Sequence, residues 1–365
     1  MSLEILHVVG ARPNFMKVAP IISCMNNFPD LIEQRMVHTG QHYDDNLSKV
    51  FFQDLDLPEP DEYLNAGSGT HAEQTAKIMI AFEPVLLKYN PDWCFVVGDV
   101  NSTLACALVC SKRGTKIGHV EAGLRSGDRT MPEEINRLLT DQISDLLFTH
   151  SKDADLNLIN EGISPEKIRF VGNVMIDTLK KMLPKTTDRK ILMEHGIEHK
   201  KYILVTLHRP SNVDVPEKFE EILSALSVLS HKYTVIFPVH PRTRLKVSSA
   251  NIKENLSRIH FIEPVGYLDF LGLMNSSALT LTDSGGVQEE TTYLGVPCLT
   301  LRQNTERPVT IEMGTNQLIE TRRDSIIRAV ESRMYKSNIS TSIPELWDGY
   351  AAHRIVKEIL NFKKD

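Results

Sequence analysis

Carboxylate and guanidinium side chains are concentrated between residues 121 and 134, directly after a short apolar run that ends at Val120. The set comprises Glu121, Arg125, Arg129, Glu133 and Glu134. Acids that follow a buried strand in a glycine-containing loop can approach a ligand closely, where they take up and release protons. The pattern therefore predicts the rim of an active site. A structural alternative is a capping box made by Thr130 and Glu133, with Glu134 in the favourable field of a helix N-terminus.

A further acid, Asp99, ends another apolar run and precedes a predicted helix that begins near Ser102. If the two runs are neighbouring strands, Asp99 and Glu121 lie at the same edge of the sheet. Carboxylates crowded into one site shift each other's pKa values apart, which allows separate acid and base roles. The alternative for Asp99 is an N-cap of the following helix.

The second half of the chain carries two histidines, His208 and His240, each after an apolar run. A histidine in such a position can move protons near neutral pH, or can simply be a polar residue at the end of a strand. For His240 the second interpretation is favoured. His208 is therefore the candidate for proton transfer.

Two glycine-containing turns are suited to phosphate. Ser284, Gly285 and Gly286 separate an apolar run from a predicted helix, so backbone N–H groups and the helix dipole can face an anion. Glu290 then fits a ribose, and the arginines Arg302 and Arg307 follow the next run. The first turn is Gly10-Ala11-Arg12-Pro13, with Lys17 one helical turn later. Neither turn has the NAD or ATP glycine pattern, so a ribose-bearing diphosphate such as a nucleotide-sugar fits better. The alternatives are ordinary glycine turns and surface charges.

Short β-branched runs alternate with amphipathic segments, which is typical of parallel sheets built from βαβ units. We therefore expect an α/β fold with two doubly wound, Rossmann-like domains facing a cleft, formed by residues 1–172 and 173–349. A final helix over residues 350–365 is expected to return to the first domain. The expected strands lie near residues 5–9, 35–39, 93–98, 117–120, 146–149, 168–171, 202–207, 234–239, 260–262, 278–282 and 298–301.

Composition excludes several classes of protein. The net charge of −6 provides no basic surface for nucleic acid, and no apolar run reaches the ~20 residues that span a membrane. The five cysteines are scattered, and none has the spacing of a zinc site. Residues 1–4 lead into a strand without the pattern of a signal peptide. We expect a cytoplasmic protein that uses no metal or other cofactor.

Taken in order, these segments resemble the non-hydrolysing UDP-N-acetylglucosamine 2-epimerases over nearly the whole chain. The matching segments are Gly10-Ala11-Arg12-Pro13 with Lys17, Thr39-Gly40-Gln41-His42, Gly98-Asp99, His119-Val120-Glu121-Ala122-Gly123-Leu124-Arg125, Pro132-Glu133-Glu134-x-Asn136-Arg137, His208-Arg209, Asp283-Ser284-Gly285-Gly286-x-Gln288-Glu289-Glu290 and Thr305-Glu306-Arg307-Pro308. The resemblance implies a fold like that of the GT-B glycosyltransferases and a homodimer. It also implies reversible epimerisation of UDP-GlcNAc to UDP-ManNAc at C2, through elimination of UDP to 2-acetamidoglucal and re-addition.

The resemblance also implies roles for individual residues. The catalytic residues it implies are Asp99, Glu121, Glu133 and His208. The residues it implies for binding the UDP-sugar are Arg12, Lys17, Phe270, Ser284, Gly285, Gly286, Glu290 and Arg307. Glu134 is expected to have only a dipole or surface role, and Arg125 and Arg129 have no assigned role.

The chain departs from the family pattern at three places. Asn14 stands where many members have an acid, and Val265 stands where a glutamine near uracil is common. Residues 43–46 lack the arginine and glutamine of members that a second UDP-GlcNAc activates, which argues against that regulation. Residues 39–44 and 67–71 also resemble the branch that acts on UDP-2,3-diacetamido-2,3-dideoxyglucuronate, an alternative substrate. The remaining alternatives are a GT-B glycosyltransferase and a catalytically silent nucleotide-sugar sensor.

Overall fold

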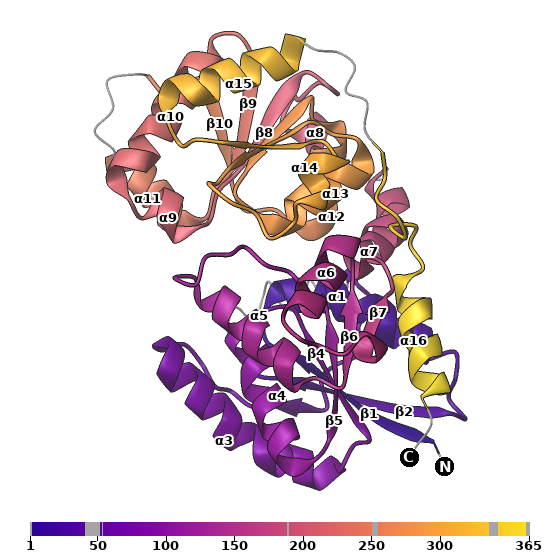
Figure 1. Ribbon diagram of the computed structural model, residues 1–365. Coiled ribbons are helices and arrows are strands. Elements are labelled where there is room, and N and C mark those ends of the chain that lie inside the picture. The colour runs from indigo at the N-terminus through magenta and orange to yellow at the C-terminus, as the bar shows by residue number, and fades with distance from the viewer. Residues whose placement is uncertain are drawn as a thin grey trace. The chain divides into compact units, whose positions relative to one another are not determined.

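The computed structural model describes residues 2–40, 52, 54–187, 190–249, 255–335 and 342–362. The chain divides into two units (Figure 1). The first unit comprises Met1–Lys181 together with Glu345–Asp365, and the second comprises Met182–Pro344.

The first unit contains a parallel sheet with the strand order β3-β2-β1-β4-β5-β6-β7. Its strands are β1 (Leu3–Val9), β2 (Ile32–His38), β3 (Glu62–Tyr63), β4 (Trp93–Val97), β5 (Lys116–Val120), β6 (Leu146–Thr149) and β7 (Ile168–Phe170). Its helices are α1 (Arg12–Met25), α3 (His71–Tyr89), α4 (Asn101–Arg113), α5 (Pro132–Ile143), α6 (Lys152–Asn160), α7 (Val174–Met182) and α16 (Ala351–Asn361), with the short 3-10 helix η1 (Pro165–Lys167).

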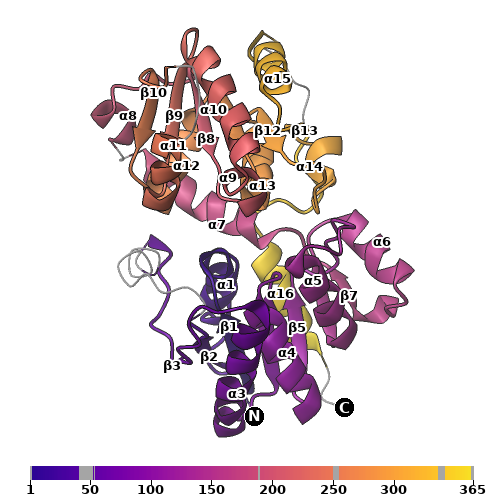
Figure 2. The same cartoon turned by 90° about the vertical axis from the view of Figure 1, so that its left-hand side faces the viewer.

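Side chains that alternate along the strands of this sheet form two separate cores, because successive strand residues point to opposite faces. Ile5 belongs to the core that includes residues of α1 and α16, whereas Leu6 belongs to the core that includes residues of α3 and α4. The C-terminal helix α16 thus completes one face of the first sheet. Helices α3 and α4 lie side by side in both views of the unit (Figures 1 and 2).

The second unit contains a parallel sheet with the order β10-β9-β8-β11-β12-β13. Its strands are β8 (Tyr202–Thr206), β9 (Thr234–Pro238), β10 (Ile259–Ile262), β11 (Leu279–Thr282), β12 (Cys298–Leu301) and β13 (Asn316–Ile319). Its helices are η2 (Leu183–Thr186), α8 (Ile191–Glu194), α9 (Pro210–Val213), α10 (Pro216–Ser230), α11 (Pro241–Ser249), α12 (Tyr267–Ser276), α13 (Gly285–Leu294), α14 (Val309–Glu312) and α15 (Arg323–Tyr335). Residues of α10 and α15 share one core with the central strands.

Both sheets are doubly wound, so the predicted α/β fold is confirmed. In the first sheet the direction of winding reverses between β1 and β4, and in the second it reverses between β8 and β11. Ligands of such sheets bind at this reversal, outside the carboxyl ends of the strands. Strands β3 and β13 were missed by the sequence analysis because each is short and begins with polar residues.

Candidate active site

The backbone just after β1 packs closely against a side chain in the first turn of α4. A Cβ atom on Gly10 would lie 2.2 Å from Ser102 Oγ, so glycine is required there. The side chain of Asn14 accepts hydrogen bonds from the N–H groups of Gly10 (3.0 Å) and Ala11 (2.9 Å) and donates one to the carbonyl of Val97 (2.9 Å). The neutral side-chain amide of Asn14 therefore connects the ends of β1 and β4, the two strands on either side of the winding reversal.

Glu121 directly follows β5 and has a backbone φ of 70°, in the left-handed region. A non-glycine residue in this conformation is strained, and such strain persists where the surrounding structure holds it. The buried carboxylate of Glu121 forms an ion pair with the buried ammonium group of Lys17 in α1. Lys17 also lies close to Gly98, where an added Cβ would be 3.3 Å from the ammonium nitrogen. Arg12 is the first residue of α1, and its side chain lies outside the described residues.

Asp99 follows β4, and its carboxylate accepts a hydrogen bond from Nη1 of Arg137 in α5. Its backbone carbonyl accepts another from the side-chain amide of Asn136, at 2.8 Å. The N-cap of α4 is Val100, without a side-chain capping bond. The capping alternative for Asp99 is therefore wrong, since its carboxylate is bound by α5 instead.

Thr130 and Glu133 do not form the alternative capping box. Helix α5 begins at Pro132 with Met131 as its N-cap, and no side chain caps it. The hydroxyl of Thr130 donates instead to Asp128, at 2.6 Å. Glu133 lies half-buried in the first turn of α5.

Glu134 was expected to have a dipole or surface role; it does lie in the first turn of α5, but the expected surface position is wrong. Its carboxylate is buried and accepts hydrogen bonds from the N–H groups of Ser126 (3.0 Å) and Gly127 (2.8 Å). It also accepts from Nη2 of Arg137, at 2.6 Å. Burial raises the pKa of Glu134, but these bonds outweigh burial and leave the pKa below its ordinary value. Glu134 thus holds both the loop after β5 and the arginine that binds Asp99.

In the second unit, Asp283 connects the loops that follow β8 and β11. Its buried carboxylate accepts hydrogen bonds from the N–H groups of His208 (3.1 Å) and Arg209 (3.0 Å) and from the amide of Asn212 (3.2 Å). Burial raises its pKa, but the bond from His208 and the other donors outweigh burial and leave the pKa below the ordinary value.

His208 is held by the same carboxylate, with Nδ1 3.0 Å from Oδ1 of Asp283. Because an ionised carboxylate only accepts hydrogen bonds, Nδ1 carries the hydrogen and Nε2 is the position that exchanges protons. The side chain is 63% exposed. Asp283 therefore orients His208 as aspartate orients histidine in many hydrolases.

The predicted phosphate loop lies at the N-terminus of α13, where Ser284 is the N-cap and Gly285 and Gly286 are the first helical residues. An added Cβ on Gly285 would lie 2.5 Å from Nη1 of Arg307. Arg307 therefore packs directly against this glycine, with a buried guanidinium that donates to Glu289 (2.6 Å) and to its neighbour Glu306 (2.5 Å). The glycine turn thus has the Arg307–Glu306 ion pair beside it.

Glu306 is the centre of this ion-pair cluster. It also accepts a hydrogen bond from Arg302, at 2.6 Å, and lies 3.8 Å from Arg209. Burial raises the pKa of Glu306, but the guanidinium groups of Arg307 and Arg302 hold it well below its ordinary value. The sequence analysis did not single out the buried acids Asp283, Glu289 and Glu306, although all three lie within its motifs.

Glu290 is the buried acid expected to contact ribose. Burial raises its pKa to about 7, against the hydrogen bond that the hydroxyl of Tyr267 donates at 2.8 Å. Phe270, expected beside uracil, is half-buried and lies three residues after Tyr267 on α12.

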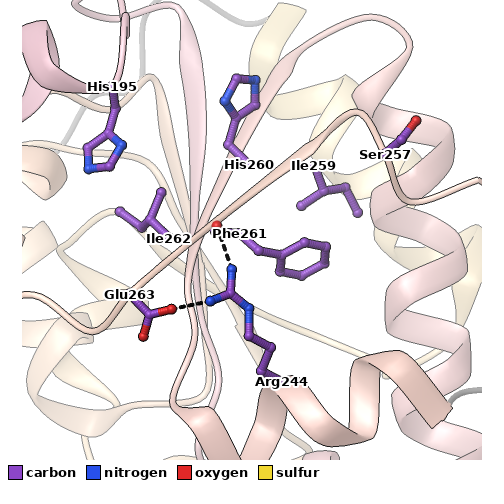
Figure 3. Close-up of a pocket in the computed structure, with 8 residues that line it drawn as sticks. All are labelled: His195, Arg244, Ser257, Ile259, His260, Phe261, Ile262 and Glu263. Carbon is purple, nitrogen blue, oxygen red and sulfur yellow. Dashed lines mark hydrogen bonds and ion pairs between the residues drawn. The ribbon is translucent and has the colours of Figure 1, made fainter.

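A separate hollow lies at the edge strand β10 (Figure 3). Arg244 pairs there with Glu263 and donates to the carbonyl of Phe261, at 3.1 Å. None of the predicted site residues lines this hollow. The arginine protects a sheet edge, and the hollow is therefore not a candidate for the active site.

Within the described residues there is no group of three or more His, Cys, Asp or Glu side chains that could hold a metal ion. In the same part of the chain, every helix is too short or too polar to cross a membrane.

Two doubly wound α/β units, one with acids at strand ends and one with a glycine turn opening a helix, define a two-domain protein of the GT-B-like class. A glycosyltransferase from Rickettsia africae shares this fold, with a TM-score of 0.54 at 13% identity. The model of the UDP-N-acetylglucosamine 2-epimerase family matches residues 27–360. The chain belongs to this family.

Individual relatives are similar over nearly their full length. A UDP-N-acetylglucosamine 2-epimerase from Methanococcus maripaludis is 44% identical over 98% of both chains. A UDP-2,3-diacetamido-2,3-dideoxy-D-glucuronate 2-epimerase from Pseudomonas aeruginosa is 40% identical, over 92% of this chain and 93% of the relative. The crystal structure of a Methanocaldococcus jannaschii UDP-GlcNAc 2-epimerase in complex with UDP-GlcNAc and UDP superposes with a TM-score of 0.89, at 43% identity over 98% of this chain and 99% of that chain.

The raised pKa of Glu290 predicts a pH-dependent stability cost. The folded-state pKa of about 7 exceeds the ordinary 4.5, so the carboxylate destabilises the fold as pH rises from 4.5 to 7 and continues to do so above. Glu290→Gln should therefore unfold at a higher temperature than the wild type at pH 8, with a smaller difference at pH 5. Circular dichroism melts at both pH values measure this. The exposed Glu312→Gln is the control, and a lower melting temperature for Glu290→Gln at pH 8 would contradict the prediction.

Proposed function

We propose that this protein interconverts UDP-N-acetylglucosamine and UDP-N-acetylmannosamine by epimerisation at C2, without a metal or other cofactor. The observation that carries the proposal is the 44% identity, over nearly the whole length of both chains, to an enzyme of that name. The related crystal structure that holds UDP-GlcNAc and UDP supports the same substrate.

The reaction needs a base for the C2 proton and an acid that returns a proton to the opposite face. Elimination breaks the C2–H and C1–O bonds, forms the C1–C2 double bond of 2-acetamidoglucal and releases UDP with the electron pair. Re-addition of UDP follows protonation at C2. We assign the proton transfers to Asp99, Glu121, Glu133 and His208. In support, Asp99 and Glu121 follow the paired strands β4 and β5, and each is held by a basic side chain.

The leaving diphosphate gains negative charge as the C1–O bond breaks. We propose that Ser284, Gly285 and Gly286 bind this diphosphate, because the N-terminus of α13 supplies N–H donors and a favourable dipole. Arg307 beside Gly285 adds positive charge. We further assign Arg12 and Lys17 to the diphosphate, as the family resemblance implies, and Glu290 and Phe270 to the nucleoside.

His208 is suited to proton transfer at the leaving group. Its Nδ1 is engaged by Asp283, and its exposed ring leaves Nε2 to give or accept a proton. Elimination and re-addition of the same group require one residue to act in both directions, which a histidine near neutral pH can do.

A second candidate substrate is UDP-2,3-diacetamido-2,3-dideoxyglucuronate. The observation that favours it is the 40% identity to the Pseudomonas aeruginosa epimerase of that name. The chemistry at C2 is the same, so the catalytic residues would not differ. The likeness to a glycosyltransferase, at 13% identity, concerns the fold alone.

Incubating the purified protein with each UDP-sugar alone in D2O tests the proposal. We expect deuterium at C2 of UDP-GlcNAc and the appearance of UDP-ManNAc, followed by NMR. If C2 exchange is faster with UDP-2,3-diacetamido-2,3-dideoxyglucuronate than with UDP-GlcNAc, the diacetamido sugar is the preferred substrate. Absence of C2 exchange with both sugars would reject epimerisation.

Replacing Asp99 by Asn removes a proton acceptor while preserving the shape of the side chain. We expect turnover to fall by about 100-fold or more, the usual range for a general acid or base. Affinity for UDP should stay within about threefold, because the proposed UDP contacts lie mainly on the second unit. Coupled turnover assays and calorimetric UDP titration measure the two effects. Asp30→Asn, at an exposed position in the first unit, is the matched control; wild-type turnover in Asp99→Asn would remove this residue from the mechanism.

We also propose a homodimer, as the family resemblance implies. In support, Ile80 and Leu87 on α3 are 75% and 57% exposed, and apolar residues of the adjoining α4 line a hollow beside Ile80. Ile80→Asp should convert the dimer to a monomer in light scattering after size-exclusion chromatography, because a charge in an apolar interface is costly. Met193→Asp, at an equally exposed apolar residue of the second unit, should remain dimeric. A monomeric wild type would contradict the proposal.

A further inference from the structure

His119 is a fully buried histidine in β5, two residues before Glu121. Its Nε2 lies 2.8 Å from the backbone carbonyl oxygen of Gly98, the residue before Asp99. Its Nδ1 lies 2.6 Å from Oδ1 of Asp141, a buried acid on α5. The ring therefore connects the segments that carry two of the proposed catalytic acids.

The partners of His119 determine where its hydrogens are. A carbonyl oxygen only accepts hydrogen bonds, so Nε2 must carry a hydrogen. The other oxygen of Asp141 accepts from the N–H of Gly123 (3.1 Å) and lies 2.7 Å from Nη2 of Arg125. A carboxylate in these contacts is ionised and also only accepts, so Nδ1 must carry a hydrogen as well.

The charges around the ring support the same state. Arg125 also forms a two-bond ion pair with Glu161, at 2.7 and 2.6 Å. With a neutral ring, one guanidinium would face two carboxylates, the fully buried Asp141 and the partly exposed Glu161. With a protonated ring, two positive groups face two negative groups. The pKa of Asp141 is below its ordinary value because His119 and Arg125 together outweigh burial.

We propose that His119 is a buried imidazolium and a positioning residue for the proposed epimerisation. One N–H group fixes the Gly98 carbonyl next to Asp99. The other binds Asp141, which in turn fixes Gly123, two residues after Glu121. The role in epimerisation rests on the proposed function, whereas the protonation state of the ring does not.

Nitrogen NMR of protein labelled with 15N-histidine tests the protonation state in the wild type. We expect both ring nitrogens of His119 to carry hydrogens in the folded protein. His7 is an internal control, because it is also fully buried in the first unit, bonds to Gln34, and has a pKa lowered to about 4 by burial. His7 should therefore be neutral in the same sample at neutral pH. His119→Asn identifies the resonance, and a through-bond experiment on the wild type does so if that variant does not fold. A neutral His119 ring would overturn the inference.

Kinetics of His119→Gln test the positioning role. The uncharged amide of glutamine cannot donate hydrogen bonds to both the Gly98 carbonyl and the Asp141 carboxylate in the way that the ring does. We expect kcat for the UDP-sugar to fall by about 100-fold, since small misplacements of catalytic groups have effects of this size. KM and UDP affinity should change by less than about threefold, because most of the proposed UDP contacts belong to the second unit. His7→Gln should lower the melting temperature but preserve kcat. Wild-type kcat in His119→Gln, or equal losses of kcat and UDP binding, would overturn the positioning role. A wild type without C2 exchange would reject the proposed function, and the NMR result would stand independently.

Discussion

A charge removed from water must be compensated, and this constraint organises both halves of the protein. Parallel sheets place polar residues at the carboxyl ends of buried strands, where desolvation of an isolated carboxylate costs several kcal/mol. In the first unit, Lys17 pairs with Glu121 and Arg137 pairs with Asp99. In the second unit, Asp283 is satisfied by backbone N–H groups and by His208. Each compensating contact also fixes the direction of the acid, so the same contacts supply electrostatic stability and the geometry of the proposed catalytic groups.

The two units compensate their buried charges in different ways. The first keeps acids at strand ends and supports them from α5, whose buried Glu134 and Asp141 reach the loop after β5. The second places a glycine turn at the opening of α13 and surrounds it with buried ion pairs around Glu306. The first arrangement suits proton transfer at carbon, and the second suits an anion. An elimination that removes a proton and releases a diphosphate needs both.

Some features of the site oppose stability. Glu121 is held in the left-handed region of φ, which disfavours residues other than glycine. Glu290 is buried with a pKa raised to about 7, so its ionised form is costly in the free protein. Both features lower the stability of the free protein, and both belong to carboxylates that we propose act on the substrate. The proposed roles would explain why the chain retains them.

The sequence by itself determined the alternation of strands and helices, the two doubly wound sheets and the positions of Asp99, Glu121 and Ser284 at strand ends. These follow from local periodicity and from glycine turns, which act over a few residues. Only the tertiary structure decided that Glu134 is buried, whereas its neighbour Glu133 is half-buried, and that Asp141 reaches His119 across 22 residues of chain. Such partners depend on how a helix is rotated against the sheet. Local sequence specifies that a face is polar, but burial and pairing are set by the contacts that the whole fold brings together.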